Sequence, residues 1–251
     1  IITPQQIAQG GGDDYLLQIN TFFATTGLPA YIRPLGEPNR CLNAYAVVDC
    51  RGYERGGSYS HRWYKSAFRR IAIIVRGGEK RGTINRRLAD IGLPKVQKLR
   101  KKQKLLRRLP TAPVAIVWSP LPDGSPNVDA NEPRYFWPGK DWVDWVGTDF
   151  YSRYGNWKHL KKFYSVFAKG KNKPFALTEW GLWGEDQPRY VKKVFRFMKQ
   201  RDYADMLIYY QDFGSSNEFR IQNFPRSKKA LKKKIDSDRF PKFAKKFPRF
   251  R

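Results

Sequence analysis

The sequence contains very few of the residues that bind metals or carry acyl-transfer chemistry. Its 251 residues include only two Cys and two His. Structural zinc sites need four Cys or His ligands at characteristic spacings, and two His supply no convincing Ser-His-Asp or Cys-His set. We therefore expect no metal and no cofactor, and the composition argues against hydrolysis by acyl transfer.

Long apolar segments and nucleotide-binding glycine motifs are also absent. No run approaches the ~20 apolar residues of a membrane span, so we expect no transmembrane segment. Residues 1–10 lack the basic start and apolar stretch of a signal peptide, a pattern that fits a chain beginning partway into a longer precursor. Neither a G-x-G-x-x-G fingerprint nor a G-x-x-x-x-G-K-[ST] loop occurs, which argues against a nucleotide-binding fold.

Acidic residues are scarce, with 22 Asp and Glu against 49 Lys and Arg, so the formal net charge is +27. Such a charge attracts anionic polymers (nucleic acid, anionic lipid or acidic polysaccharide), although a solvated surface gives the same composition. With 41% hydrophobic and 16% aromatic residues, the chain is too apolar to be disordered. The basic residues concentrate in three segments: Lys95–Arg108, Lys228–Lys234 and Arg239–Arg251.

The two cysteines, Cys41 and Cys50, lie in one short segment. Their proximity favours a local disulfide, and two free thiols are the alternative. Because disulfides persist in oxidising compartments, the disulfide interpretation predicts a secreted protein.

Short apolar runs recur along the chain at a spacing of about 30 residues, the length of a strand–helix–strand unit. Runs of this kind are typical of buried parallel strands. We predict strands at 30–35, 114–118, within 142–150, at 175–179 and at 206–210, with a possible sixth at 1–3.

Segments with helical spacing of apolar residues separate these strands. One helix is expected after Asp13 and Asp14, and a second between Trp63 and Val75. Two more are predicted at 157–167 and 191–198, the latter with Asp186 as its N-cap and Pro188 in its first turn. The pattern predicts an α/β fold of the (β/α)8 barrel type that lacks its first one or two strands. We expect the barrel at 1–226 and a basic tail at 227–251.

Polar and aromatic side chains follow the ends of the predicted strands, where barrel enzymes keep their active sites. Glu37 follows the strand at 30–35, and Glu179 ends the strand at 175–179. Two carboxylates at one mouth, surrounded by aromatic rings, are typical of glycosidases, although strand-end Glu residues also form salt bridges and Trp residues usually pack in the core. The candidate substrate-binding residues are Arg33, Asn39, Trp118, Asp149, Tyr151, Trp180 and Trp183.

Three segments resemble the family-26 glycoside hydrolases, the β-mannanase group: YIRPLGEPNRCLNAYA, VDWVGTDFYS and FALTEWGLWG. The resemblance spans most of residues 1–226. It implies a (β/α)8 barrel and a retaining mechanism with Glu37 as general acid/base and Glu179 as nucleophile, about 5 Å apart. It also implies that Tyr151 bonds the nucleophile and that Trp118 lines a sugar subsite.

Next to Glu37 the chain departs from the family pattern, with Gly36 where the better-known mannanases have His and Pro38 where Met is usual. We therefore expect a polysaccharide substrate of the β-mannan or β-glucan type. Three alternatives stay open: hydrolysis of an acidic polysaccharide, a degenerate carbohydrate-binding barrel, and association with nucleic acid through the basic tail. A missing strand would also leave an exposed sheet edge that invites self-association.

Overall fold

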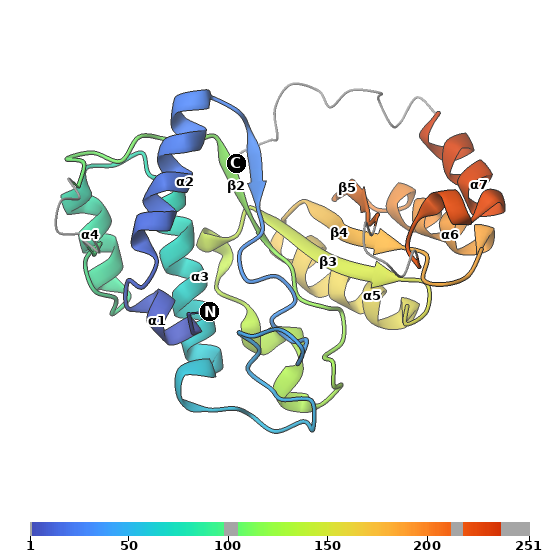
Figure 1. The fold of residues 1–251 in the computed structure, drawn as a ribbon, viewed down its shortest axis with the longest axis horizontal. Coiled ribbons are helices and arrows are strands. Elements are labelled where there is room, and N and C mark those ends of the chain that lie inside the picture. Colours follow the sequence, from blue (N-terminus) through green and yellow to red (C-terminus); the bar gives the residue numbers. More distant parts are fainter. Residues whose placement is uncertain (1, 98–104, 212–217, 237–251) are drawn as a thin grey trace. The chain divides into compact units, whose positions relative to one another are not determined.

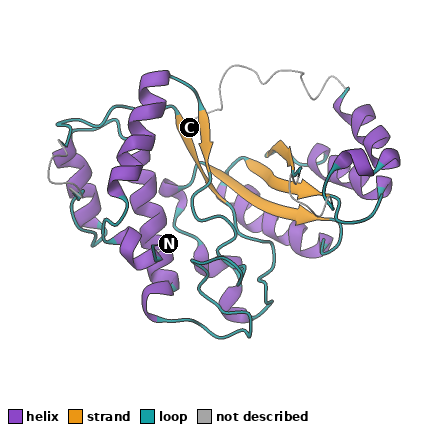
Figure 2. Cartoon of the chain, in the orientation of Figure 1, coloured by secondary structure: helices purple, strands orange, loops and turns teal. Residues whose placement is uncertain are grey.

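A computed structural model describes residues 2–97, 105–211 and 218–236. The chain divides into two compact units, with the boundary between Asp144 and Trp145. Each unit is an α/β arrangement in which helices alternate with parallel strands (Figures 1 and 2). Within the described residues, no helix is long and apolar enough to cross a membrane.

The described residues of unit 1 form two parallel strands and four α-helices. Strand β1 pairs with β2 in the register Ala30↔Val114 to Ile32↔Ile116. Helix α2 packs against α3, as Figure 1 also shows. The elements are α1 (Pro4–Ala8), α2 (Asp13–Thr26), β1 (Ala30–Ile32), α3 (His61–Arg76), α4 (Arg81–Asp90) and β2 (Val114–Trp118), with short 3-10 turns at Gly57–Tyr59, Asp129–Asn131, Pro133–Phe136 and Lys140–Trp142.

A buried ion pair joins the helices of unit 1. Arg70 of α3 donates to both carboxylate oxygens of Asp13, at 2.7 and 2.5 Å, and neither side chain is exposed. Asp13 also accepts a hydrogen bond from the backbone of Gln97, and Arg70 donates to the carbonyl of Pro94. Because every charge has a partner, the pair is tolerated in the core and ties α2, α3 and the 94–97 segment together.

In unit 2 the described residues form three parallel strands with β4 in the middle, paired to β3 on one side and β5 on the other. Six of the seven residues of β4 are buried, as expected for a parallel strand covered on both faces. The elements are β3 (Trp145–Tyr151), α5 (Trp157–Phe163), a π-helical turn (Tyr164–Ala168), a 3-10 turn (Lys169–Lys171), β4 (Phe175–Gly181), α6 (Pro188–Lys199), β5 (Ala204–Tyr209), a second 3-10 turn (Ile221–Asn223) and α7 (Pro225–Ile235).

The five main strand predictions are confirmed, and the run at 114–118 matches β2 at both ends. The possible strand at 1–3 is wrong as far as the structure describes it. Thr3 is the N-cap of α1, where its side chain accepts from Gln6 and the Gln6 side chain returns a hydrogen bond to the Thr3 backbone. This reciprocal capping box satisfies donors that a strand would have left for a neighbour.

The start of α6 also differs from the prediction. Its N-cap is Gln187, whereas Asp186 turns away and accepts hydrogen bonds from the backbone of Arg226 and Ser227 in the first turn of α7. Helix α7 spans the predicted boundary at 226/227, so the Lys-rich run 228–234 is helical and packs against α6. The rest of the predicted tail, 237–251, and residues 98–104 of the first basic segment lie outside the described residues.

Candidate active site

Glu37 follows β1 in a loop with an unusual backbone. Leu35 and Glu37 both have a φ of 49°, in the left-handed region that side chains other than glycine rarely adopt. The Glu37 carboxylate is 14% exposed and accepts from the Arg40 guanidinium at 3.1 Å. Strained conformations of this kind persist only where surrounding contacts enforce them, and they concentrate at functional sites.

Hydrogen bonds from three sides hold this loop in place. The Glu37 amide donates to the carbonyl of Ser119, just after β2, at 2.7 Å. Asn43 donates to the Glu37 carbonyl at 2.8 Å, and Tyr45 donates to the Gly36 carbonyl. A Cβ on Gly36 would lie 2.6 Å from Nε of Arg33, so the guanidinium occupies the space that a side chain would take. Glycine at position 36 thus allows Arg33 to pack against the loop.

Asn39 is fully buried and serves the loop itself. Its amide nitrogen donates to the carbonyl of Leu121 at 3.0 Å, and its amide oxygen accepts from the Leu121 backbone at 2.8 Å. Asn131 donates in turn to the Asn39 carbonyl. The disulfide between Cys41 and Cys50 closes a loop of the chain shortly after Asn39. These contacts fasten the Glu37 loop to the segment after β2, which gives Asn39 a positioning role.

Trp118, the last residue of β2, has no exposed surface. Its indole donates to the carbonyl of Phe136 at 3.0 Å, and its ring meets that of Trp137 edge-on at 4.9 Å. The buried ring supports Trp137 and fixes the segment after β2. Arg33, Glu37, Asn39 and Trp118 all belong to unit 1.

In unit 2, Glu179 of β4 lies beside Tyr151 at the end of β3. The Tyr151 hydroxyl donates to Oε2 of Glu179 at 2.7 Å. The Tyr151 ring is enclosed edge-on by three aromatic rings at 5.4 to 6.0 Å, those of Trp183, Tyr210 and Phe219. Such packing fixes the hydroxyl toward the carboxylate. Sequence analysis missed Tyr210 and Phe219, which follow the last strand without a recognisable motif.

Asp149 lies next to this pair in the sheet, in register with Glu179. It is 2% exposed and accepts from the hydroxyl of Thr178 at 2.8 Å. The β3–β4 ladder shifts register between Thr148 and Asp149, a local irregularity that re-aims side chains near strand ends. Asp149 therefore supports the end of the sheet from within.

Trp180 faces the other side of β4. Neighbouring residues of a strand point to opposite faces, so Trp180 points away from Glu179. Its ring is 1% exposed and packs at 5.0 to 6.3 Å against those of Tyr190, Phe195 and Tyr209. The structure gives Trp180 a core role between the sheet and α6.

Burial raises the pKa of Tyr209 to about 12, and its hydroxyl donates to the Phe219 carbonyl.

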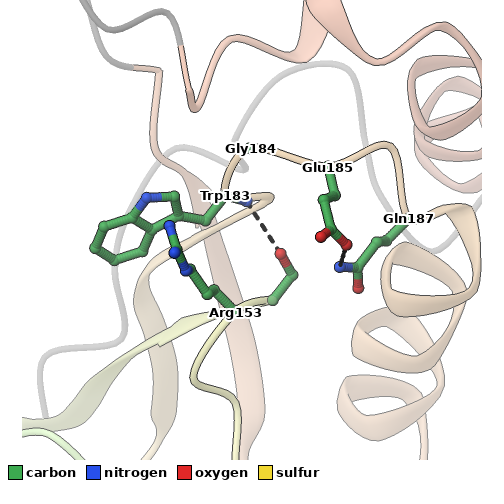
Figure 3. Close-up of a pocket in the computed structure, with 6 residues that line it drawn as sticks. Arg153, Trp183, Gly184, Glu185 and Gln187 are labelled. Atoms are coloured by element: carbon green, nitrogen blue, oxygen red, sulfur yellow. Dashed lines mark hydrogen bonds between the residues drawn. The ribbon is translucent and has the colours of Figure 1, made fainter.

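A pocket of about 360 Å³ is lined by residues that follow β3 and β4 in the chain. Its walls combine an aromatic ring, a guanidinium, a carboxylate and an amide (Figure 3). The Trp183 backbone donates to the hydroxyl of Ser152 at 3.0 Å, and the Gln187 amide donates to Glu185 at 2.8 Å. The volume of the pocket falls within the usual range of small-ligand sites. The lining residues are Ser152, Arg153, Trp183, Gly184, Glu185 and Gln187.

Trp183 is oriented for its place in this pocket. Its indole donates to Glu218 at 3.1 Å, and its ring meets those of Tyr154 at 5.2 Å and Phe219 at 4.9 Å. An indole face beside hydroxyl, amide and charged groups is the combination that binds sugars, whose rings have an apolar face and a polar rim. Among the predicted site residues, Asp149, Tyr151, Glu179 and Trp183 thus cluster within unit 2.

No group of three or more His, Cys, Asp or Glu that could hold a metal occurs in the described part of the chain.

Comparisons with known proteins identify similar structures but no similar sequences. No family model and no curated protein matches the chain. A Cellulomonas fimi endo-β-1,4-mannanase double mutant superposes with a TM-score of 0.54 at 16% identity over 93% of this chain and 49% of its own. A GH26 β-mannanase from Bacteroides ovatus gives 0.52 at 16% over 94% and 62%, and the catalytic domain of a Bacillus sp. GH26 endo-β-1,4-mannanase gives 0.50 at 17% over 91% and 56%.

These similarities establish the fold. The chain is an α/β protein of the TIM-barrel type, and its described residues supply five parallel strands with their helices. It spans between 49% and 62% of the length of the three solved structures. Because identity does not exceed 17% in them, the likeness carries no assignment of substrate or mechanism.

Proposed function

We propose that this protein is a glycoside hydrolase of the family-26 type that cleaves β-linked polysaccharide, of the mannan or glucan kind, with retention of configuration. The observation that carries the proposal is the hydrogen bond from Tyr151 to Glu179 at the carboxyl ends of adjacent parallel strands. Catalytic groups of barrel enzymes lie at these ends. A phenol fixed against a carboxylate holds that carboxylate in one orientation, as a nucleophile requires.

In the proposed reaction, Glu179 attacks the anomeric carbon while Glu37 donates its proton to the departing glycosidic oxygen. The C–O bond to the leaving group breaks as a glycosyl ester forms on Glu179. Glu37, now ionised, takes a proton from water, and the resulting hydroxide displaces Glu179 from the sugar. A retaining outcome needs the two carboxyl groups about 5 Å apart. Arg40, which is 3.1 Å from Glu37, orients the acid/base carboxyl in this scheme.

The pocket lined by Trp183, whose ring contacts that of Tyr151, is the proposed sugar-binding surface. The indole face would stack on a pyranose ring, while Gln187, Glu185 and Ser152 would bond its hydroxyls. The disulfide supports a further proposal, that the protein works outside the cell, because oxidising compartments preserve such bonds.

The proposal is tested by reducing-end release from mannan, glucomannan, β-glucan, xylan and a polyuronate. Wild type should release ends from one of the neutral β-glycans, and Glu179→Gln and Glu37→Gln should each lower that rate by at least about 10³-fold. Glu132→Gln, an exposed carboxylate in an ion pair with Arg134, is the matched control and should keep full activity. Full activity in both site variants would refute the proposal.

A second candidate function is carbohydrate binding without turnover. The Arg40–Glu37 contact favours it, because Oε2 of Glu37 is already engaged by the Arg40 guanidinium at 3.1 Å. Glycan binding by a folded preparation that releases no reducing ends would support this candidate. Release from the polyuronate alone would instead identify an acidic-polysaccharide hydrolase.

A further inference from the structure

Three helices of unit 2 contain basic residues and no acidic ones. Helix α5 has three Lys, α6 has five Lys or Arg, and α7 has six. None of the three contains Asp or Glu, although the chain has 22 such residues in all. The basic residues are Lys158, Lys161, Lys162, Arg189, Lys192, Lys193, Arg196, Lys199, Arg226, Lys228, Lys229, Lys232, Lys233 and Lys234.

These side chains are all exposed, and together we call them the cationic face. The apolar side chains of α6, from Tyr190 to Met198, are buried beneath it. Helix α5 meets α6 through the rings of Trp157 and Phe197, at 6.1 Å. Helix α7 packs against α6 and is fixed by Asp186. The cationic face therefore spans three helices that contact one another in turn, α5 with α6 and α6 with α7.

This arrangement costs stability in the free protein. Lysines four residues apart on a helix repel each other, and a Glu or Asp at that spacing normally offsets the repulsion. In α7 the pairs Lys228–Lys232 and Lys229–Lys233 have this spacing, and in α6 the pair Lys192–Arg196 does. An anionic polymer lying across the helices would relieve the repulsion along its whole length.

We propose that the cationic face binds an acidic polysaccharide, a polyuronate, as an extended chain. Eleven of its fourteen basic residues are Lys, whose ammonium attracts an anionic chain as a point charge, without the planar fork by which Arg pairs with carboxylates and phosphates alike. No aromatic ring of the three helices is among the exposed large side chains, so the stacking platforms of single-strand nucleic-acid binders are absent from these described helices. The apolar residues of α6 are mostly buried, which leaves that helix little to insert into a membrane.

The cationic face and the proposed nucleophile lie on opposite sides of the sheet of unit 2. Trp180 contacts Tyr190 and Phe195 of α6, whereas the preceding residue, Glu179, points the other way toward Tyr151. A polyuronate on the helices would leave the strand ends free. The face would thus hold the protein in an acidic polysaccharide matrix, whichever glycan the strand ends accept.

The test measures polygalacturonate binding by the full chain at about 50 mM and about 200 mM salt. Replacing Lys228, Lys229, Lys232 and Lys233 with Gln should weaken binding at the lower salt by more than about tenfold and flatten its salt dependence. The matched control replaces four exposed basic residues of unit 1, Arg62, Arg86, Arg107 and Lys140, with Gln. It carries the same change in net charge and should shift the dissociation constant by less than about threefold. Circular dichroism verifies that both variants fold.

Three results would overturn the proposal: no polygalacturonate binding at about 50 mM salt, equal loss in both quadruple variants, or tighter binding to double-stranded DNA or to phosphatidylserine vesicles than to polygalacturonate. Glu179→Gln should bind polygalacturonate as wild type does, and the α7 variant should cleave a neutral glycan as wild type does. Failure of the binding proposal and failure of the proposed hydrolysis are therefore separate observations.

Discussion

The hydroxyl of Tyr151 donates a 2.7 Å hydrogen bond to Oε2 of Glu179, across adjacent parallel strands. The rings of Trp183, Tyr210 and Phe219 enclose the tyrosine and leave its hydroxyl a restricted direction. The carboxylate is thus oriented by a group whose own position is fixed by packing.

Removing this hydroxyl should reduce catalysis without unfolding the protein. A hydrogen bond to a charged group contributes about 1.5–3 kcal/mol, so Tyr151→Phe should lower kcat by about 10- to 150-fold. Tyr154→Phe is the control, because Tyr154 lies three residues after Tyr151, is exposed and keeps its ring contact with Trp183. Steady-state kinetics on the glycan that wild type cleaves provides the measurement. An unchanged kcat in Tyr151→Phe would show that the hydroxyl does not contribute to catalysis.

Breaking the buried ion pair of unit 1 should be severely destabilising. Arg70→Met leaves the Asp13 carboxylate buried without its main partner, at a cost of about 3–5 kcal/mol in the free energy of unfolding. Arg134→Met, which breaks an exposed pair with Asp129, should cost no more than about 1 kcal/mol. Urea unfolding of the two variants compares them directly. The double variant Asp13→Asn with Arg70→Met should recover part of the loss, and equal effects of the two single changes would contradict the prediction.

His61 should make stability depend on pH below neutrality. Desolvation lowers the pKa of His61 from 6.5, and the ring bonds the carbonyl of Ala130 at 2.7 Å. The unfolded chain therefore takes up its proton at a higher pH than the folded protein does. Stability from this group is complete above 6.5 and declines as pH falls from there toward the lowered folded value.

The comparison for this prediction is between wild type and His61→Gln. His61→Gln should flatten the decline in unfolding free energy on acidification below pH 6.5, relative to wild type. Thermal melts at several pH values supply the curves. If His61→Gln follows the wild-type curve, His61 is not the titrating group.

Asp186 should hold α7 to the rest of unit 2. Desolvation raises the pKa of this carboxyl, but hydrogen bonds from Ser227 and Arg226 outweigh that effect and leave the pKa below 3.8. The stabilisation is present above 3.8 and is lost as pH falls through the lowered folded value. Asp186→Ala removes the carboxylate that accepts from two backbone amides in the first turn of α7, at a cost of about 1 kcal/mol. Amide exchange within α7 should speed up accordingly, while Asp202→Ala should leave it unchanged. Unaltered α7 exchange in Asp186→Ala would show that other contacts suffice.

Sequence patterns were most informative where burial alone determines structure. The run at 114–118 is apolar throughout because β2 is covered on both faces, so both of its ends could be predicted. Glu37 and Tyr151 could be chosen because they follow such runs. The same rule did not separate Glu179 from Trp180, since only the strand's alternation decides which of the two faces the core.

Other features depend on contacts that sequence does not display. Asp186 is a residue type typical of N-caps and stands just before α6, but its partners lie some 40 residues away at the start of α7. The Lys run 228–234 hides a helix whose inward residues are few and small. From the sequence, Asn39 is a polar residue near the end of a predicted strand. Only its long-range hydrogen bonds with Leu121 and Asn131 show that it holds the Glu37 loop in position.

Trapping the glycosyl-enzyme tests most directly whether Glu179 is the nucleophile. A 2-deoxy-2-fluoro glycoside with a good leaving group, matched to the glycan that wild type cleaves, slows the second step and lets the ester accumulate. Mass spectrometry of the digested protein should locate the added sugar on Glu179, and Glu179→Gln should take up none. A sugar found on another residue, or no adduct from a preparation that still releases reducing ends with retention, would contradict the account.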